Sequence, residues 1–166
     1  MRDGIPPFPP LATKPQLGST ESESPEHSPA EFARLYTARY ANKTLAEHPA
    51  AKVRITLGHP RFRLSYQLAD TILELAPTWS MFGKSEGDFT DLYTKLLERR
   101  GGVDRIAERF AEVTRTAGVN QLVLLCFEDL HTQDLFCHRR VFAAWWEART
   151  GQVVEELPEG LEQLEL

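Results

Sequence analysis

The chain has 166 residues, 42 % of them hydrophobic and 26 % charged, which is typical of a globular protein with one hydrophobic core. No apolar run approaches the roughly 20 residues of a membrane-spanning helix, and the segment MRDGIPPFPP has no hydrophobic signal-peptide core. Two cysteines are too few for a disulfide scaffold. These features exclude neither enzymes nor binding proteins, but they favour a cytoplasmic protein with no membrane partner.

The net charge of −5 is concentrated at the two ends of the chain. Residues 1–30 contain seven of the eleven prolines and carry a balance of −2, so we expect a disordered tail there. The last twelve residues carry five glutamates and no base, and we assign residues 158–166 to an acidic C-terminal tail. The chain between these ends is close to neutral, which neither requires nor excludes a phosphate-bearing partner.

The first half of the predicted domain, which spans residues 31–157, contains two strand candidates. RLYTARY at 34–40 combines Leu35 with β-favouring tyrosines and a threonine. KVRITLG at 52–58 alternates apolar and polar residues, as a half-buried strand does. GHPRF then ends this second strand, because Pro60 has no backbone N–H to donate to a neighbouring strand.

The second half contains clearer helices and a buried strand. Asp88 is placed to cap an amphipathic helix, and a second helix is predicted over 103–117. QLVLLCF at 121–127 is a continuous apolar run, as expected of a strand buried on both faces of a parallel sheet. HRRVFAAWWEARTG is typical of a helix with Trp146 outside its buried stripe, and QVVEEL offers a last short strand. The residues of that helix expected to face inward are Val141, Phe142 and Trp145.

Strands that alternate with helices through long connections predict a single α/β domain with three layers and a mainly parallel sheet. In such sheets, ligands gather beyond the carboxyl ends of the strands. The segment LLCFEDLHTQDLFCHRR, residues 124–140, lies at that end of the most clearly predicted strand and holds both cysteines. We therefore search this segment first for a functional site.

Four residues of the segment form the candidate catalytic site. Cys126 ends the predicted strand, and Glu128 points to the same side if the strand continues. Cys137 precedes the next helix, where the helix dipole and free N–H groups favour a thiolate or a bound anion. His138 and Arg139 add positive charge beside it. The pattern predicts either a nucleophilic cysteine or an anion pocket.

Other interpretations of the cysteines stay open. Cys126 within VLLCF is equally typical of a small core residue, and a disulfide is disfavoured in a reducing compartment. Zinc is a third interpretation, although the Cys-x₁₀-Cys-His spacing matches no common zinc pattern. Its ligands would be Cys126, Cys137, His138 and either His131 or Glu128. The sequence alone therefore assigns no metal ligand, and the cofactor stays unknown.

Arginines are the candidates for binding the substrate, since a guanidinium group recognises phosphate or carboxylate through paired N–H donors. Arg39 ends the first predicted strand, Arg54 lies on the second and Arg61 follows it. If these strands flank the cysteine-containing strand, their guanidinium groups converge with Arg139 near the cysteines. Each of these arginines is also typical of an ordinary surface charge.

The segment LVLLCFEDLHTQDLFCHRRVFAAWWEARTGQVVEEL resembles the C-terminal signature of the domain-of-unknown-function 488 (DUF488) family, an apolar strand ending Leu-Cys-x-Glu followed by Cys-His-Arg at a helix start. LYTARY and VRITLGHPRF are more loosely similar to its first two strands, so the resemblance spans residues 34–157. It implies a compact α/β domain with two cysteines of functional interest and no established reaction. Many members have an Asp-Val-Arg second strand, where this chain has Lys52. The family's motif positions correspond to Cys126, Glu128, Cys137, His138 and Arg139.

Two functions from different classes fit these residues. The leading hypothesis is a small enzyme that uses the thiolate of Cys137 or Cys126 on a phosphate-bearing substrate, a nucleotide or nucleic acid. Glu128 or His138 would then act as general acid or base. The alternative is a non-enzymatic nucleic-acid or anion-binding module in which both cysteines are structural. An unusually reactive thiol at neutral pH would favour the enzyme. Salt-dependent nucleic-acid binding that is unchanged when the cysteines are replaced would favour the binding module.

Overall fold

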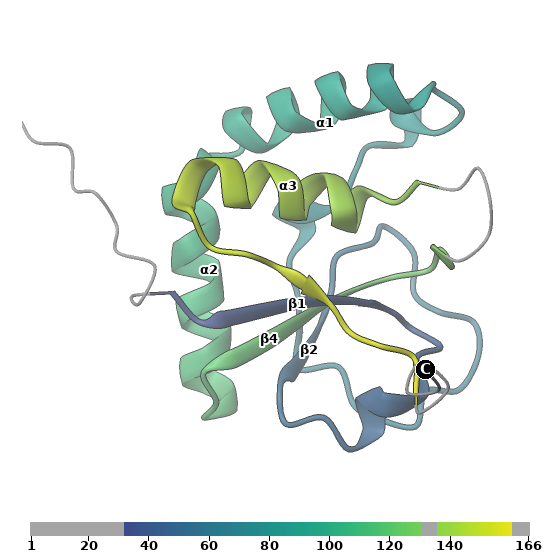
Figure 1. Ribbon diagram of the computed structural model, residues 1–166, viewed down its shortest axis with the longest axis vertical. Coiled ribbons are helices and arrows are strands. Elements are labelled where there is room, and N and C mark those ends of the chain that lie inside the picture. The colour runs from purple at the N-terminus through teal and green to yellow at the C-terminus, as the bar shows by residue number, and fades with distance from the viewer. Residues whose placement is uncertain (1–31, 131–135, 161–166) are drawn as a thin grey trace, which may run out of the picture.

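The computed structural model describes residues 32–130 and 136–160, which fold into a sheet packed against helices (Figure 1). Five strands form one sheet in the order β3-β2-β4-β1-β5, and each neighbouring pair in it is parallel. The strands are β1 (Arg34–Arg39), β2 (Ala51–Arg54), β3 (Asp70–Thr71), β4 (Gln121–Cys126) and β5 (Glu155–Glu156). The predicted α/β fold with a parallel sheet is confirmed. The predicted tail at 1–30 and positions 161–166 lie outside the described residues.

Three α-helices cover one face of the sheet: α1 (Glu86–Arg99), α2 (Gly102–Ala117) and α3 (His138–Thr150). Their buried side chains share one core with Leu35 and Leu124 of the sheet. A 3-10 helix, η2 (Lys43–Ala46), covers the opposite face together with Tyr66 and Leu68 from the chain between β2 and β3. The third layer is therefore made of irregular chain rather than α-helix. None of the described helices combines the length and apolar character needed to cross a membrane.

Strand β4 is buried on both faces, as its continuous apolar run predicts. Leu122 and Leu124 point to the helices, whereas Val123 and Leu125 belong to the core on the opposite face. Because side chains alternate along a strand, Cys126 lies on the helix side, at the carboxyl end of β4. The strand therefore delivers one cysteine to the edge of the sheet where ligands of parallel sheets gather.

Some element boundaries differ from those predicted. Helix α1 begins at Glu86 because Ser85, and not Asp88, is its cap: the Ser85 hydroxyl accepts a hydrogen bond from the backbone N–H of Asp88 at 3.2 Å. Strand β2 ends at Arg54 instead of 58. Strand β3 was not predicted, because a strand of two residues has too few side chains to show alternation. Two short 3-10 helices, η3 (Leu73–Leu75) and η4 (Trp79–Met81), lead into α1.

Helix α3 buries a wider face than its apolar stripe predicts. Trp146, expected outside the stripe, is fully buried, and its Nε1 donates to Oε1 of Gln152 at 2.8 Å. Trp145 is buried as expected, and its Nε1 donates to Oε1 of Glu98 at 3.1 Å. The reason is that α3 packs against α1, α2 and the sheet at once, so two adjacent sides of the helix are covered. The expectation that Trp146 lies outside the buried stripe is wrong.

Candidate functional site

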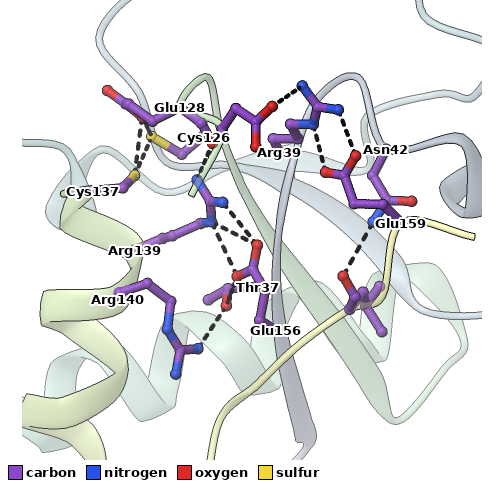
Figure 2. Close-up of polar contacts among 12 residues, drawn as sticks. Thr37, Arg39, Asn42, Cys126, Glu128, Cys137, Arg139, Arg140, Glu156 and Glu159 are labelled. Carbon is purple, nitrogen blue, oxygen red and sulfur yellow. Dashed lines mark hydrogen bonds and ion pairs between the residues drawn. The ribbon is translucent and has the colours of Figure 1, made fainter. Parts of the chain in front are cut away.

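The carboxyl end of β4 and the start of α3 bring four side chains together, which we call the cysteine cluster. Cys126 is the last residue of β4, and Glu128 lies in the turn that follows. Cys137 is the N-cap of α3, and His138 is the first residue of that helix. Figure 2 shows Cys126, Glu128 and Cys137 pointing toward one another from the strand end, the turn and the helix start. The four residues proposed from sequence as catalytic are therefore neighbours in space.

The distances within the cluster are short. The two Sγ atoms are 2.8 Å apart, and no disulfide joins them. Both sulfurs lie within hydrogen-bond distance of Oε2 of Glu128, at 2.5 Å for Cys126 and 3.0 Å for Cys137. One candidate metal-binding atom from each of the four residues lies within 4.8 Å of the other three. Four potential metal-binding atoms thus lie close together.

The imidazole of His138 is oriented by the backbone. Its Nε2 lies 2.8 Å from the carbonyl oxygen of Ile55, which can only accept a hydrogen bond, so Nε2 carries the proton. Nδ1 then faces the sulfurs, 3.4 Å from Sγ of Cys126 and 3.9 Å from Sγ of Cys137. The ring of Tyr93 contacts the imidazole edge to face at 5.8 Å. His138 therefore presents a fixed nitrogen donor to the cluster.

Protons are shared unequally between the two thiols. Burial opposes ionisation of Cys137, but the hydrogen bond from Cys126 and the contact with His138 outweigh it and lower the pKa of Cys137 to about 6. Burial and the hydrogen bond to Cys137 raise the pKa of Cys126 well above its usual value. Burial also opposes ionisation of Glu128, yet hydrogen bonds from the thiols lower the pKa of its carboxyl. The lowered pKa values of Cys137 and Glu128 favour anionic donors in the cluster, and buried negative charge is stabilised by a nearby cation.

The cluster is shielded from solvent on most sides. Cys126 and Cys137 are 1 % and 2 % exposed, His138 is buried, and Glu128 is half-buried. Cys137 also lines a groove of about 550 Å³ between α1 and α3, together with Thr90 of α1 and other residues of the two helices. The groove therefore passes beside the cluster, on the side of Cys137.

Two of the predicted substrate-binding arginines lie beside the cluster, but each already has an acidic partner. Arg139 is 1 % exposed and donates to the backbone carbonyl of Glu128 at 2.8 Å and to the carboxylate of Glu156 at 2.7 Å. Arg39 pairs with the carboxylate of Asp129 at 3.1 Å. Neither guanidinium group is hydrogen-bonded to a sulfur. Burial opposes the positive charge of Arg139, but the hydrogen bond to Glu156 and the interaction of that charge with both cysteines raise its pKa. In the described residues both arginines act as tethers of the turn after β4.

The other two arginines do not reach the cluster. Arg54 is in register with Leu125, so its side chain points to the opposite face from Cys126. Its guanidinium group donates to two carbonyl oxygens of the following loop, at 2.9 and 3.1 Å. Arg61 is exposed in that loop. The four guanidinium groups thus do not converge at the cysteines, and their binding of phosphate stays a prediction; His131, the other histidine considered for zinc, lies outside the described residues.

Sequence reasoning missed two partners of the cluster. The carbonyl of Ile55 orients His138, and no side-chain pattern identifies a backbone acceptor of this kind. The carboxylate of Glu156 binds Arg139. Glu156 was assigned only to a short final strand, and its pairing with Arg139 depends on how β5 docks beside β1. The signal that would have suggested this pair is an acidic residue, Glu156, on the strand that follows a helix with an arginine, Arg139, near its start.

Comparisons with protein-family models, with curated proteins and with solved structures find no match to this chain. The resemblance to the DUF488 family therefore stays a prediction that rests on the motif residues of β4 and α3.

Proposed function

We propose that the cysteine cluster binds a divalent metal ion and that this metal centre is the functional site of the protein. The observation that carries the proposal is the convergence of two sulfurs, a carboxylate oxygen and an imidazole nitrogen within 4.8 Å of one another. These donors come from the end of a strand, a turn and the start of a helix, so the usual spacing of zinc motifs does not apply to them.

Zinc is the metal that this set of donors suits best. Thiolate, imidazole and carboxylate are the three ligand types that zinc takes in proteins, and four of them complete its tetrahedral coordination. Two sulfurs on a tetrahedral zinc ion lie about 3.8 Å apart, so the sulfurs must separate by about 1 Å from their present 2.8 Å. The groove beside Cys137 offers space for that movement.

The surroundings of the cluster also support a metal ion. A metal-binding histidine typically donates its other N–H to a carbonyl or carboxylate, and His138 does so to Ile55. A thiolate and a carboxylate in a buried site are costly unless positive charge compensates them. Arg139, the nearest buried cation, is engaged by Glu156 and by a backbone carbonyl. A divalent cation would add positive charge at the point where the donors meet.

The purified protein is expected to bind one zinc ion per chain. After metal removal with a chelator and reloading, elemental analysis should find about one equivalent of zinc per chain in wild-type protein. His138→Gln removes a proposed ligand and should therefore weaken zinc binding strongly. The loss should exceed the factor of about 10–100 that is typical when a residue supporting a metal ligand is replaced. His59→Gln, which alters an exposed histidine, is the matched control and should retain wild-type affinity. Equal zinc affinities of the two histidine variants would contradict the assignment.

A thiolate enzyme is the second candidate, and the placement of Cys137 favours it. Its sulfur lies at the N-cap of α3, where the helix dipole stabilises an anion, and the residue lines the groove. In this candidate the thiolate of Cys137 attacks the phosphorus of a phosphate ester, so that an S–P bond forms as the P–O bond to the leaving alcohol breaks. Glu128 or His138 gives its proton to the leaving oxygen, and water then hydrolyses the S–P bond. The nucleic-acid-binding module has less support, because Arg39 and Arg139 are paired with carboxylates. For either candidate we place the protein in the cytoplasm, where its two free thiols stay reduced.

The two candidates differ in how the cysteines react. In metal-free protein near neutral pH, iodoacetamide should modify Cys137 at least about tenfold faster than Cys126, because only Cys137 is stabilised as a thiolate. Peptide mass spectrometry gives both rates, and denatured protein is the control in which they should converge. If zinc protects both cysteines, the metal centre is supported. If zinc leaves the rates unchanged but inorganic phosphate slows Cys137, the thiolate enzyme is supported.

A further inference from the structure

The chain after α3 returns across the sheet and lies against the turn that carries Glu128. Residues 155–160, which we call the C-terminal strap, begin as β5 in register with β1, where Glu156 pairs with Thr37. The strap continues past β5, where Asn42 donates to the backbone carbonyls of Leu157 and Pro158 at 3.3 and 3.2 Å. The first residues of the predicted acidic tail are therefore part of the folded domain (Figure 2).

Two arginine–glutamate pairs connect the strap to the turn after β4. In the inner pair, Arg139 places Nη2 2.7 Å from the carboxylate of Glu156 and Nη1 2.8 Å from the backbone carbonyl of Glu128. The hydroxyl of Thr37 donates to the same Glu156 carboxylate at 2.6 Å. In the outer pair, Arg39 binds Glu159 through two hydrogen bonds of 2.5 Å and Asp129 at 3.1 Å. Each guanidinium group thus bridges the strap and the turn.

The two arginine bridges act on Glu128, the residue of the cysteine cluster that no strand or helix holds in place. Cys126 is fixed by β4, whereas Cys137 and His138 are fixed by the start of α3. Glu128 lies in the turn beyond β4, and its carboxylate meets the cluster through the two thiols. The peptide group of Glu128 is held by Arg139, and the next residue by Arg39. The backbone that carries this carboxylate is therefore held by these two arginines.

We propose that the C-terminal strap positions Glu128 as a metal ligand, with Glu156 acting through Arg139 and Glu159 acting through Arg39. The inference rests on the proposed metal centre and adds a positioning role for residues that do not touch the metal. The planar fork of an arginine suits this role, because it binds a carboxylate with one side and a carbonyl with the other in a fixed geometry. A carboxylate ligand held in this way loses little conformational freedom on metal binding.

The test compares two adjacent glutamates of β5 that differ in their contacts. Glu156→Gln removes the charge that holds Arg139, and Glu155→Gln makes the same change on an exposed side chain of the same strand. Zinc affinity is measured by competition with a chelating dye, after thermal unfolding of the metal-free proteins has shown that each variant is folded. Glu156→Gln should weaken zinc binding about tenfold, in the range of second-sphere partners, and Glu155→Gln should not change it.

A double-mutant cycle with Glu128→Gln separates positioning from general destabilisation. If Glu156 acts through Glu128, Glu156→Gln should cause no further loss of affinity once Glu128 has been replaced. The visible spectrum of bound Co²⁺ reports the ligand set directly, and Glu156→Gln should shift it toward the spectrum of Glu128→Gln. If Glu156 had a purely structural role, Glu156→Gln would lower the unfolding temperature and leave the Co²⁺ spectrum unchanged. Its effect on zinc affinity would then be the same with and without Glu128→Gln.

Glu159→Gln provides a second variant that does not disturb the buried Arg139. Its pair with Arg39 is about a quarter exposed on each side, so we expect an effect of about threefold on zinc affinity. Equal zinc affinities of wild-type, Glu156→Gln and Glu159→Gln would overturn the role of the strap and leave the metal centre standing. Absence of zinc binding by the wild-type protein would overturn the metal centre, and the strap's role with it.

Discussion

Replacing Trp146 by alanine is expected to lower the free energy of unfolding by about 3–5 kcal/mol, the usual cost of emptying a buried aromatic position. Trp146 is fully buried, with its ring 5.4 Å from the ring of Phe110 and 5.7 Å from that of Phe142. The substitution also removes the hydrogen bond from its Nε1 to Gln152. Both losses act at the centre of the core between α2, α3 and the sheet.

Urea unfolding followed by far-ultraviolet circular dichroism measures this effect. Trp79→Ala is the matched control, because Trp79 is 74 % exposed and its removal should change the stability by less than about 0.5 kcal/mol. A Trp146→Ala midpoint equal to that of wild-type protein would show that the α3 face described above is not packed against the core. A large loss in Trp79→Ala alone would point to the same conclusion.

The fold was predictable where the sequence pattern reflects burial directly. The run at β4 is continuous because both of its faces are covered, and the first two helices show clear apolar stripes that end at glycines. Trp146 was misplaced because a single stripe assumes one buried side, whereas α3 contacts α1, α2 and the sheet together. β3 was missed because two residues carry no pattern, and its pairing with β2 is set by tertiary structure.

The cluster itself was predictable, and its surroundings were not. Cys126 and Cys137 are brought together by the end of one element and the start of the next, which the sequence shows through a strand run and a helix pattern. The arginines could not be placed in the same way. Arg54 was expected at the site, but strand alternation sends it to the other face of the sheet. The glutamate partners of Arg39 and Arg139 come from the strap, more than ten residues away in sequence, and they are positioned by the docking of β5.

Zinc is expected to stabilise the folded chain strongly, because the proposed ligands join the sheet to α3. An ion that binds only the folded state adds about 4 kcal/mol to the free energy of unfolding when its free concentration is a thousand times its dissociation constant. For a domain of this size that gain moves the urea midpoint by about 2 M. Cys126→Ser should abolish the gain, since the remaining ligands all lie in the turn and helix and no longer tie them to β4.

The measurement is urea unfolding in zinc buffered by a chelator, repeated for the metal-free protein and for Cys126→Ser. Metal-free wild-type and metal-free Cys126→Ser should unfold at similar midpoints, because serine differs from cysteine by one atom and Glu128 can still accept its hydrogen bond. Zinc should then separate the two curves. The same zinc-induced shift in Cys126→Ser and in wild-type protein would place the ion outside the cysteine cluster, and no shift in either would leave Cys137 as a thiolate nucleophile without a metal.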